Sequence, residues 1–279
     1  MKQWIKNIFV FVPLIFSLQF MQLDSVINAG MAFMAFCFAS SFIYIINDTI
    51  DRKNDARHPK KKFRPIASGE ISVTAAICIA IFCILICGFI LAYIDDAKTI
   101  AVIALYIVLN LLYSWKLKHI PLIDVICIAF GFILRVYAGA YAIGVTVSSY
   151  LYLTMLFLSM FLAFGKRKSE ILRISAVSRK SLEGYSVAII DKYLSILCSA
   201  VIISYALYTM DANIIARFDT NRLIYSEIFI VYGMLRYLGE LERSSDFDDP
   251  TDNLYRDKPL IAVGFLYAIY ILLLFTKTI

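Results

Sequence analysis

Long apolar runs separated by short polar segments account for most of this chain. An α-helix needs about 20 apolar residues to cross the hydrocarbon core of a bilayer, and the runs approach that length. The pattern predicts about nine membrane-spanning helices, near residues 8–23, 29–46, 73–94, 99–114, 121–143, 147–165, 190–209, 223–239 and 259–276. We therefore expect an all-α, polytopic membrane protein in which residues 1–279 form one integral membrane domain.

Composition supports this fold class. Of the 279 residues, 61% are hydrophobic, and the mean hydropathy is +0.77, as in membrane proteins. The six cysteines all fall inside apolar runs and are expected to be small buried hydrophobic residues. With two histidines in the chain, a zinc site is not expected. The net charge of +6 is no sign of nucleic-acid binding here, because Lys and Arg placement sets membrane orientation instead.

The distribution of basic residues predicts that orientation. With the N-terminus inside, most of the 27 Lys and Arg residues fall on cytoplasmic segments. The polar segments around residues 47–69, 113–124 and 165–170 then share the cytoplasmic side. We expect a multi-pass protein of the cell inner (plasma) membrane, with its N-terminus and a cavity for chemistry facing the cytoplasm.

The polar segment 43–69 has the densest candidate chemistry. If the helix before it continues, Asn47, Asp51 and Asp55 share one face, with Asp48 beside them. Carboxylates gathered in this way suit Mg²⁺, which keeps waters and bridges to phosphates. A basic cluster follows, at Arg57, Lys60, Lys61, Lys62 and Arg64. A charge-rich loop facing anionic lipid would explain the basic residues, but it gives the acidic residues no partner.

Asp124 and Arg135 are charged residues within one predicted span. They are eleven residues apart, so on a helix they share a face about 16 Å apart. A charge at the depth of Arg135 costs a few kcal/mol, so a paired or functional role is expected. A structural Arg–Asp pair is one reading. A phosphate bound bidentately by the guanidinium is the other, with Arg135 at the floor of the cavity and Lys118 and Tyr113 at its mouth.

A transporter for an anionic substrate is an alternative that would use Arg135 as its intramembrane site. Transporters commonly contain internal repeats, and the sequence has no evident one. The polar residues also gather on one predicted side of the membrane, which favours chemistry on a lipid head group.

The acidic motif and the nine predicted spans together resemble the UbiA-type prenyltransferase superfamily. That resemblance implies a UbiA-type helical bundle in which Asp48, Asp51 and Asp55 hold Mg²⁺ on a diphosphate. The superfamily carries a second acidic motif after the sixth span. This chain has the basic segment Gly165-Lys166-Arg167-Lys168-Ser169-Glu170 there instead, which argues against ordinary prenyl transfer to an aromatic ring.

A branch of the superfamily, the decaprenyl-phosphate phosphoribosyltransferase family, resembles the chain more closely. The matching segments are Lys2–Asn7, Asn47–Asp55, His58-Pro59, Arg64–Gly69, Tyr113-Ser114, Leu117-Lys118, Pro121, Asp124, Gly131–Ala140, Gly165–Arg167, Glu170 and Arg236-Tyr237. The resemblance implies transfer of 5-phosphoribose from phosphoribosyl diphosphate (PRPP) to a polyprenyl phosphate, with release of diphosphate. The alternative enzyme is a UbiA-type prenyltransferase that moves a prenyl group to a small or aromatic acceptor.

Predicted site residues follow from this reading. The candidate catalytic set is Asp48, Asp51, Asp55, Lys118 and Arg135, of which the three aspartates are the metal ligands. The candidate substrate-binding set is Lys2, Lys6, Asn47, Lys60, Arg64, Tyr113, Asp124, Lys166, Arg167 and Glu170. Glu170 is placed to brace the neighbouring cations or the ribose hydroxyls. The expected cofactor is Mg²⁺, and the expected partners are PRPP, a polyprenyl phosphate and the bilayer; the sequence leaves polyprenol length and homo-oligomer formation open.

Overall fold

Helices account for all the regular secondary structure in the part of the chain that the structure describes. The structure is a computed structural model that describes residues 2–57, 61–173, 184–243 and 257–276. It divides into two compact units. Unit 1 comprises Met1–Lys118 and Gly131–Val147, and unit 2 comprises His119–Phe130 and Ser148–Ile279.

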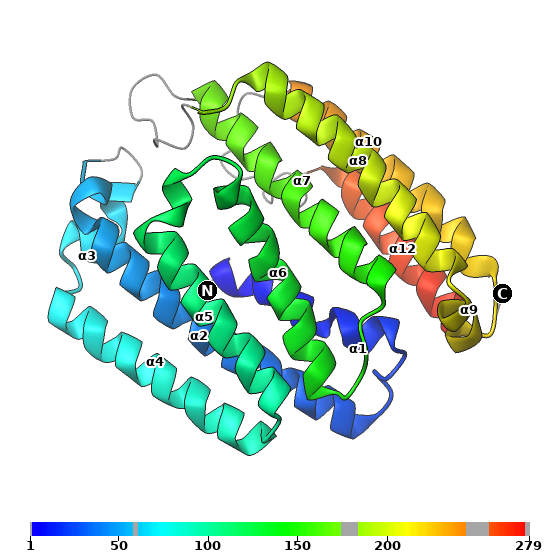
Figure 1. The fold of residues 1–279 in the computed structure, drawn as a ribbon, viewed down its shortest axis with the longest axis horizontal. Helices are drawn as coiled ribbons and strands as arrows, with labels where there is room; N and C mark the ends of the chain where they lie inside the picture. Colours follow the sequence, from blue (N-terminus) through cyan, green and yellow to red (C-terminus); the bar gives the residue numbers. More distant parts are fainter. Residues whose placement is uncertain (1, 58–60, 174–183, 244–256, 277–279) are drawn as a thin grey trace. The chain divides into compact units, whose positions relative to one another are not determined.

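Unit 1 is built from the N-terminal helices (Figure 1). In chain order they are η1 (Lys2–Phe11), α1 (Val12–Phe16), α2 (Leu23–Asp55), η2 (Lys61–Phe63), α3 (Pro65–Ser68), α4 (Val73–Ile94), α5 (Ala97–Trp115) and η3 (Leu117–His119). The later part of α6 (Ile123–Ala142) completes the unit. A short turn joins α4 to α5, in which Asp95 adopts a left-handed conformation and Asp96 caps α5 by accepting from the Thr99 N–H.

Small residues allow the helices of unit 1 to pack closely. On α2, Ala32, Ala35 and Ala39 are fully buried in a core that also includes residues of α4, α5 and α6. The backbone of η1 passes close to α6, where a Cβ added at Gly139 would collide with the Val10 carbonyl group. These contacts hold η1 against the bundle without a large apolar side chain between them.

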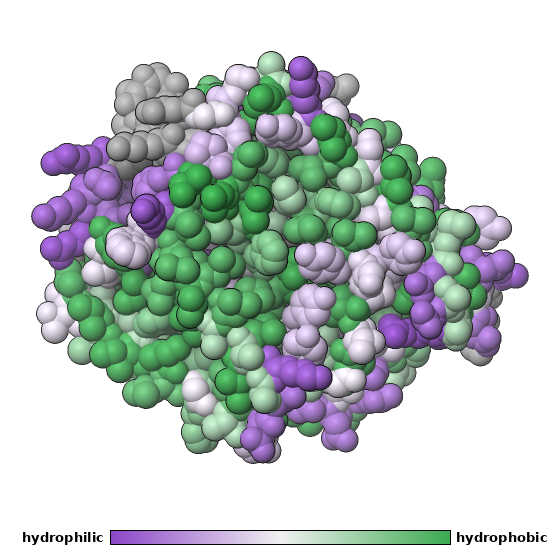
Figure 2. Space-filling view, viewed as in Figure 1, coloured by the Kyte–Doolittle hydropathy of each residue, from purple (hydrophilic) through white to green (hydrophobic). Residues whose placement is uncertain are grey.

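The outer faces of unit 1 are apolar. Phe82, Leu85 and Phe89 of α4 are exposed, as expected for side chains that face lipid. Figure 2 shows the apolar surface over α4 and α5, with hydrophilic side chains gathered at the end of the unit where α3 lies. Five of the six cysteines are buried as predicted; Cys78 is exposed on the apolar surface of α4, so the prediction was wrong for that residue.

Unit 2 contains the C-terminal helices (Figure 1). After the first turns of α6 they are α7 (Ser149–Arg173), α8 (Val187–Met210), α9 (Ala212–Phe218), η5 (Arg222–Ser226), α10 (Glu227–Arg243) and α12 (Lys258–Phe275). Helices α7 and α8 pack along each other, and α10 packs on both α8 and α12. Phe161 and Phe164 of α7 lie in the core, and the Phe161 ring packs beside Tyr237 of α10.

The predicted fold class is confirmed, and the protein is a multi-pass membrane protein. Within the described residues, seven helices are long and apolar enough to cross a membrane: α2, α4, α5, α6, α7, α8 and α12. The predicted span at 8–23 lies over a shorter apolar helix, Trp4–Phe16, and the one at 223–239 lies over α10, which has 17 residues. The count of nine spans and the cytoplasm-facing cavity stay predictions.

Candidate active site

The acidic motif lies on the last turns of α2. This helix runs unbroken from Leu23 to Asp55, so Asn47, Asp51 and Asp55 share a face as predicted, with Asp48 beside them. Asp55 is buried although it is the last residue of the helix. Asn47 hydrogen-bonds the neighbouring Asp48 carboxylate.

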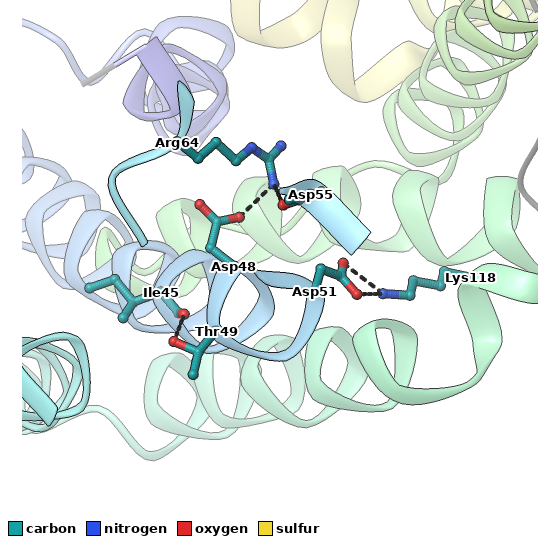
Figure 3. A network of polar contacts seen from close by, with 7 residues as sticks. All are labelled: Ile45, Asp48, Thr49, Asp51, Asp55, Arg64 and Lys118. Carbon is teal, nitrogen blue, oxygen red and sulfur yellow. Dashed lines mark hydrogen bonds and ion pairs between the residues drawn. The ribbon is translucent and has the colours of Figure 1, made fainter. Parts of the chain in front are cut away.

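Arg64 joins two of these carboxylates. Its Nη1 atom lies 2.7 Å from Asp48 Oδ1 and 2.8 Å from Asp55 Oδ2 (Figure 3). The backbone places Arg64 there, because Pro65 begins α3 and Arg64 is its extended N-cap residue. Gly69 ends α3 with a left-handed φ of 85° that few other residues adopt. The loop after α2 therefore turns Arg64 back onto the helix that precedes it.

Lys118 neutralises the third carboxylate. Its ammonium group donates to both oxygens of Asp51 at 2.8 Å (Figure 3). Lys118 belongs to η3 and is buried, with 6% of the residue exposed. The two candidate catalytic residues, 67 positions apart in sequence, are thus brought into direct contact. We call Asp48, Asp51, Asp55, Arg64 and Lys118 the acidic cluster.

The acidic cluster has donor chemistry that suits a hard divalent cation. Three carboxylates offer oxygen ligands, and Asp48 and Asp55 are already gathered around one cationic nitrogen of Arg64. Within the described residues, no three His, Cys, Asp or Glu side chains converge on one point as a ready metal cage. Mg²⁺ often binds proteins through one or two carboxylates together with substrate phosphates, so this geometry fits it. Asp48 and Asp55 would hold the metal, and Asp51 lies one turn away.

Arg135 has a different environment from the one expected. It is 5% exposed, and its guanidinium donates to Asn7 Oδ1 at 2.9 Å, to the Gly131 carbonyl at 2.6 Å and to Tyr106 Oη at 3.0 Å. Asn7 in turn donates to Ser40 of α2 at 3.0 Å. In the described part of the chain, these hydrogen-bond partners of Arg135 are all neutral. The structural Arg–Asp pair considered from sequence is therefore not found there.

Aromatic rings surround the same guanidinium. Its Cζ lies 5.1 Å from the Phe36 ring centre, 4.9 Å from that of Tyr106 and 5.3 Å from that of Phe132. Ring faces attract cations, and more strongly away from water. Three hydrogen bonds and three rings supply much of what a buried charge needs, which explains how Arg135 is tolerated on α6. Its predicted binding of a phosphate stays a prediction.

A second polar cluster lies in unit 2. Asp124 is fully buried and accepts from Arg167 Nε at 2.7 Å and from the Tyr185 hydroxyl at 2.9 Å. Arg167 also pairs with Glu170, three residues further along α7. Glu170 was expected to brace the neighbouring cations, and its contact with Arg167 agrees with that expectation. We call Asp124, Arg167, Glu170 and Tyr185 the arginine cluster.

Tyr185 fixes this arrangement from the other side. Burial raises the pKa of its hydroxyl, so the group stays protonated and donates a hydrogen bond to the Asp124 carboxylate. The Tyr185 oxygen also accepts from the Leu122 backbone N–H. Asp124 was predicted to bind substrate. In unit 2 its carboxylate contacts Arg167 and Tyr185, so Asp124 is placed to position Arg167.

The remaining predicted site residues fall into two groups. Some lie on described helices, and others lie outside the residues that the structure describes. Lys6 on η1, Tyr113 on α5 and Lys166 on α7 are half-buried. The Lys2 side chain, all of Lys60 and the matched pair His58-Pro59 lie outside the described residues.

Sequence reasoning missed three residues of these networks: Asn7, Tyr106 and Tyr185. Asn7 ends the polar N-terminal segment Lys2–Asn7, and nothing there marks it as a buried residue. Tyr106 and Tyr185 are two of 18 tyrosines, and nothing in the sequence separates them from the others.

The comparisons with known proteins agree with this architecture. The model of the UbiA prenyltransferase family matches residues 9–216, well over half of the chain. The chain belongs to the UbiA prenyltransferase family. The matched range includes the acidic cluster, Arg135 and the arginine cluster.

Relatives in this family support an enzymatic role. The chain is 35% identical to a decaprenyl-phosphate phosphoribosyltransferase of Corynebacterium glutamicum, over 98% of this chain and 86% of the relative. It is 32% identical to a protein of the same name from Mycolicibacterium smegmatis, over 76% of this chain and 69% of the relative. These similarities confirm the resemblance identified in the sequence.

Solved structures share the fold. A UbiA homologue from Archaeoglobus fulgidus, bound to GPP and Mg²⁺, matches with a TM-score of 0.70 and 20% identity over 98% of both chains. A structure described for digeranylgeranylglyceryl phosphate synthase matches with a TM-score of 0.68 and 17% identity, over 99% of this chain and 94% of that one. At these identities the likeness establishes the UbiA-type helical fold alone.

Proposed function

We propose that the protein transfers 5-phosphoribose from PRPP to a polyprenyl phosphate. The products are a polyprenyl-phosphate-linked 5-phosphoribose and diphosphate. The observation that carries the proposal is the arginine cluster, whose Arg167 and Glu170 lie on α7 where prenyl-diphosphate enzymes of the superfamily have a second acidic motif. The relatives named decaprenyl-phosphate phosphoribosyltransferase support a phosphoribosyl group as the group transferred and a polyprenyl phosphate as the acceptor.

The charges suit substrates that carry several phosphates. PRPP has a diphosphate and a separate 5-phosphate, and the acceptor brings another phosphate. The acidic cluster accounts for one divalent cation, with Arg64 and Lys118 as cationic neighbours. Lys166 and Arg167 on α7 are proposed to bind a phosphate group, with Glu170 and Asp124 holding Arg167 in position.

The reaction requires little of the protein beyond positioned charge. The bond from ribose C1 to the diphosphate oxygen breaks, and a bond from C1 to the lipid phosphate oxygen forms. When bound, Mg²⁺ makes the diphosphate a better leaving group. The ribose passes through an oxocarbenium-like state, and the lipid phosphate is already an anionic nucleophile. A general base is therefore not required, and fixed charges carry most of the stabilisation.

The location follows from the same proposal. Polyprenyl phosphate is anchored in the bilayer, and PRPP is water-soluble. The protein is proposed to act in the inner (plasma) membrane, with its N-terminus and active site on the cytoplasmic side, where basic residues are concentrated.

Purified protein in detergent provides the test. PRPP labelled in the ribose is incubated with decaprenyl phosphate and Mg²⁺, and label in the organic phase is measured. We expect a lipid-soluble phosphoribosyl product that disappears when chelator is added and returns with Mg²⁺. The matched reaction contains geranyl diphosphate and a small aromatic acid. Prenylated acid without any lipid-linked phosphoribose would replace this proposal with ordinary prenyl transfer.

A further inference from the structure

We propose that Arg64 is an exchangeable internal counter-ion of the acidic cluster, so that a divalent cation binds together with a diphosphate and not before it. The guanidinium holds Asp48 and Asp55 until a diphosphate offers it a better partner. This inference rests on the proposed function only in taking the acidic cluster as the metal site.

The geometry places Arg64 where a cation between the two carboxylates would lie. A single nitrogen, Nη1, contacts Asp48 at 2.7 Å and Asp55 at 2.8 Å (Figure 3). A metal bound by the same two oxygens would put a second positive charge beside the guanidinium. Like charges at such distances repel strongly, so the metal and the Arg64 contact exclude each other.

Formal charge gives the reason for linking metal to diphosphate. The acidic cluster has three carboxylates and two cations, Arg64 and Lys118. A divalent cation that arrives alone gains the carboxylates of Asp48 and Asp55, but it leaves the Arg64 guanidinium without them. A diphosphate that arrives with the metal supplies new anionic oxygens for the displaced guanidinium. Binding of the two ligands is then mutually favourable.

The Arg64 side chain can exchange its carboxylate partners for a diphosphate, and the Lys118 side chain cannot do so readily. The Arg64 side chain is 36% exposed, whereas that of Lys118 is 8% exposed and both oxygens of Asp51 are committed to it. Ion pairs with an exposed partner are weak and exchange readily. The Arg64 backbone is fixed, since its N–H donates to the Lys61 carbonyl and its carbonyl accepts from the Ser68 N–H. Only the side chain has to rotate, so the guanidinium stays within reach of the acidic cluster.

The test measures Mn²⁺ binding in place of Mg²⁺, by the electron paramagnetic resonance signal of free Mn²⁺, with protein in detergent and no diphosphate present. We expect Arg64→Gln to bind Mn²⁺ about tenfold more tightly than the parent, because two ion pairs no longer compete. Lys62→Gln is the matched control. It removes one charge from an exposed residue of the same loop and should leave Mn²⁺ affinity unchanged. Asp48→Asn combined with Arg64→Gln should lose the gain.

The proposal would be overturned if Arg64→Gln bound Mn²⁺ no more tightly than the parent protein does. If Arg64→Gln does not fold, Arg64→Lys replaces it. The ammonium lacks the planar fork and is more strongly hydrated, so a gain of about threefold is expected, and no gain counts against the exchange.

The outcome is independent of PRPP turnover. Protein that shows the Arg64→Gln gain but transfers prenyl groups would refute the proposed function and leave the exchange standing. Protein that turns over PRPP without the gain would do the reverse.

Discussion

Arg135 Nε donates a hydrogen bond of 2.9 Å to the side-chain oxygen of Asn7, and this contact joins α6 to the N-terminal segment η1. Asn7 is fully buried and donates onward to Ser40 of α2. A charged residue that sequence assigned to a phosphate is therefore also the centre of a hydrogen-bond network in unit 1.

The network predicts a loss of stability in Arg135→Leu. The variant leaves Asn7, Tyr106 and the Gly131 carbonyl without their partner, and each unsatisfied buried group costs about 1–3 kcal/mol. The phosphate reading of Arg135 predicts instead that the same variant is inactive yet at least as stable as the parent. Thermal unfolding in detergent without substrate distinguishes the two. Asn7→Ala should show a smaller loss, about 1–2 kcal/mol, and an unchanged unfolding temperature in both variants would contradict the structural role.

The acidic cluster predicts loss of activity without loss of fold. Asp48→Asn and Asp55→Asn should each lower turnover by orders of magnitude, because an amide is a neutral and poorer ligand for a hard cation. Asp51→Asn should do the same, because it removes the carboxylate that holds the Lys118 ammonium. The variants should still elute as folded protein from a sizing column in detergent. Glu70→Gln is the control. It changes an exposed carboxylate just after Gly69 and should keep its activity. Near-normal turnover in all three aspartate variants would remove them from the mechanism.

The arginine cluster predicts that Asp124→Asn is strongly destabilising. Its partner Arg167 is 1% exposed, and removing one charge of a buried pair typically costs about 3–5 kcal/mol. Tyr185→Phe removes one hydrogen bond to the same carboxylate and should cost about 1 kcal/mol. Unfolding measurements on both variants check which of them loses more stability. If Asp124→Asn proves no less stable than Tyr185→Phe, the carboxylate is not holding a buried charge.

The close approach of η1 to α6 predicts an effect of one methyl group. In Gly139→Ala the new Cβ would collide with the Val10 carbonyl, which is backbone and cannot rotate away. We expect a loss of about 1–3 kcal/mol, as for other overpacked sites. Gly88→Ala on α4 is the control, since its Cβ would meet nothing within 4 Å. It should be neutral or slightly stabilising, because alanine favours the helix by up to about 1 kcal/mol, and an equal effect at both sites would refute the steric argument.

The sequence by itself determined the helical membrane architecture and the acidic face of α2. Apolar runs of spanning length leave the backbone no alternative to helix inside a bilayer. The spacing of Asn47, Asp51 and Asp55 then fixes their shared face, because helix geometry is the same in every protein. Caps such as Asp96 could be read in the same way, since they act within one turn.

The tertiary structure decided which charged side chains contact each other. Lys118 reaches Asp51 across 67 residues, and Arg167 reaches Asp124 across 43. No local rule relates such positions, because these contacts depend on how whole helices pack. For the same reason the sequence suggested an aspartate or a phosphate for Arg135, whereas packing of η1, α2 and α5 around α6 surrounded it with Asn7, Tyr106 and the Phe36 ring.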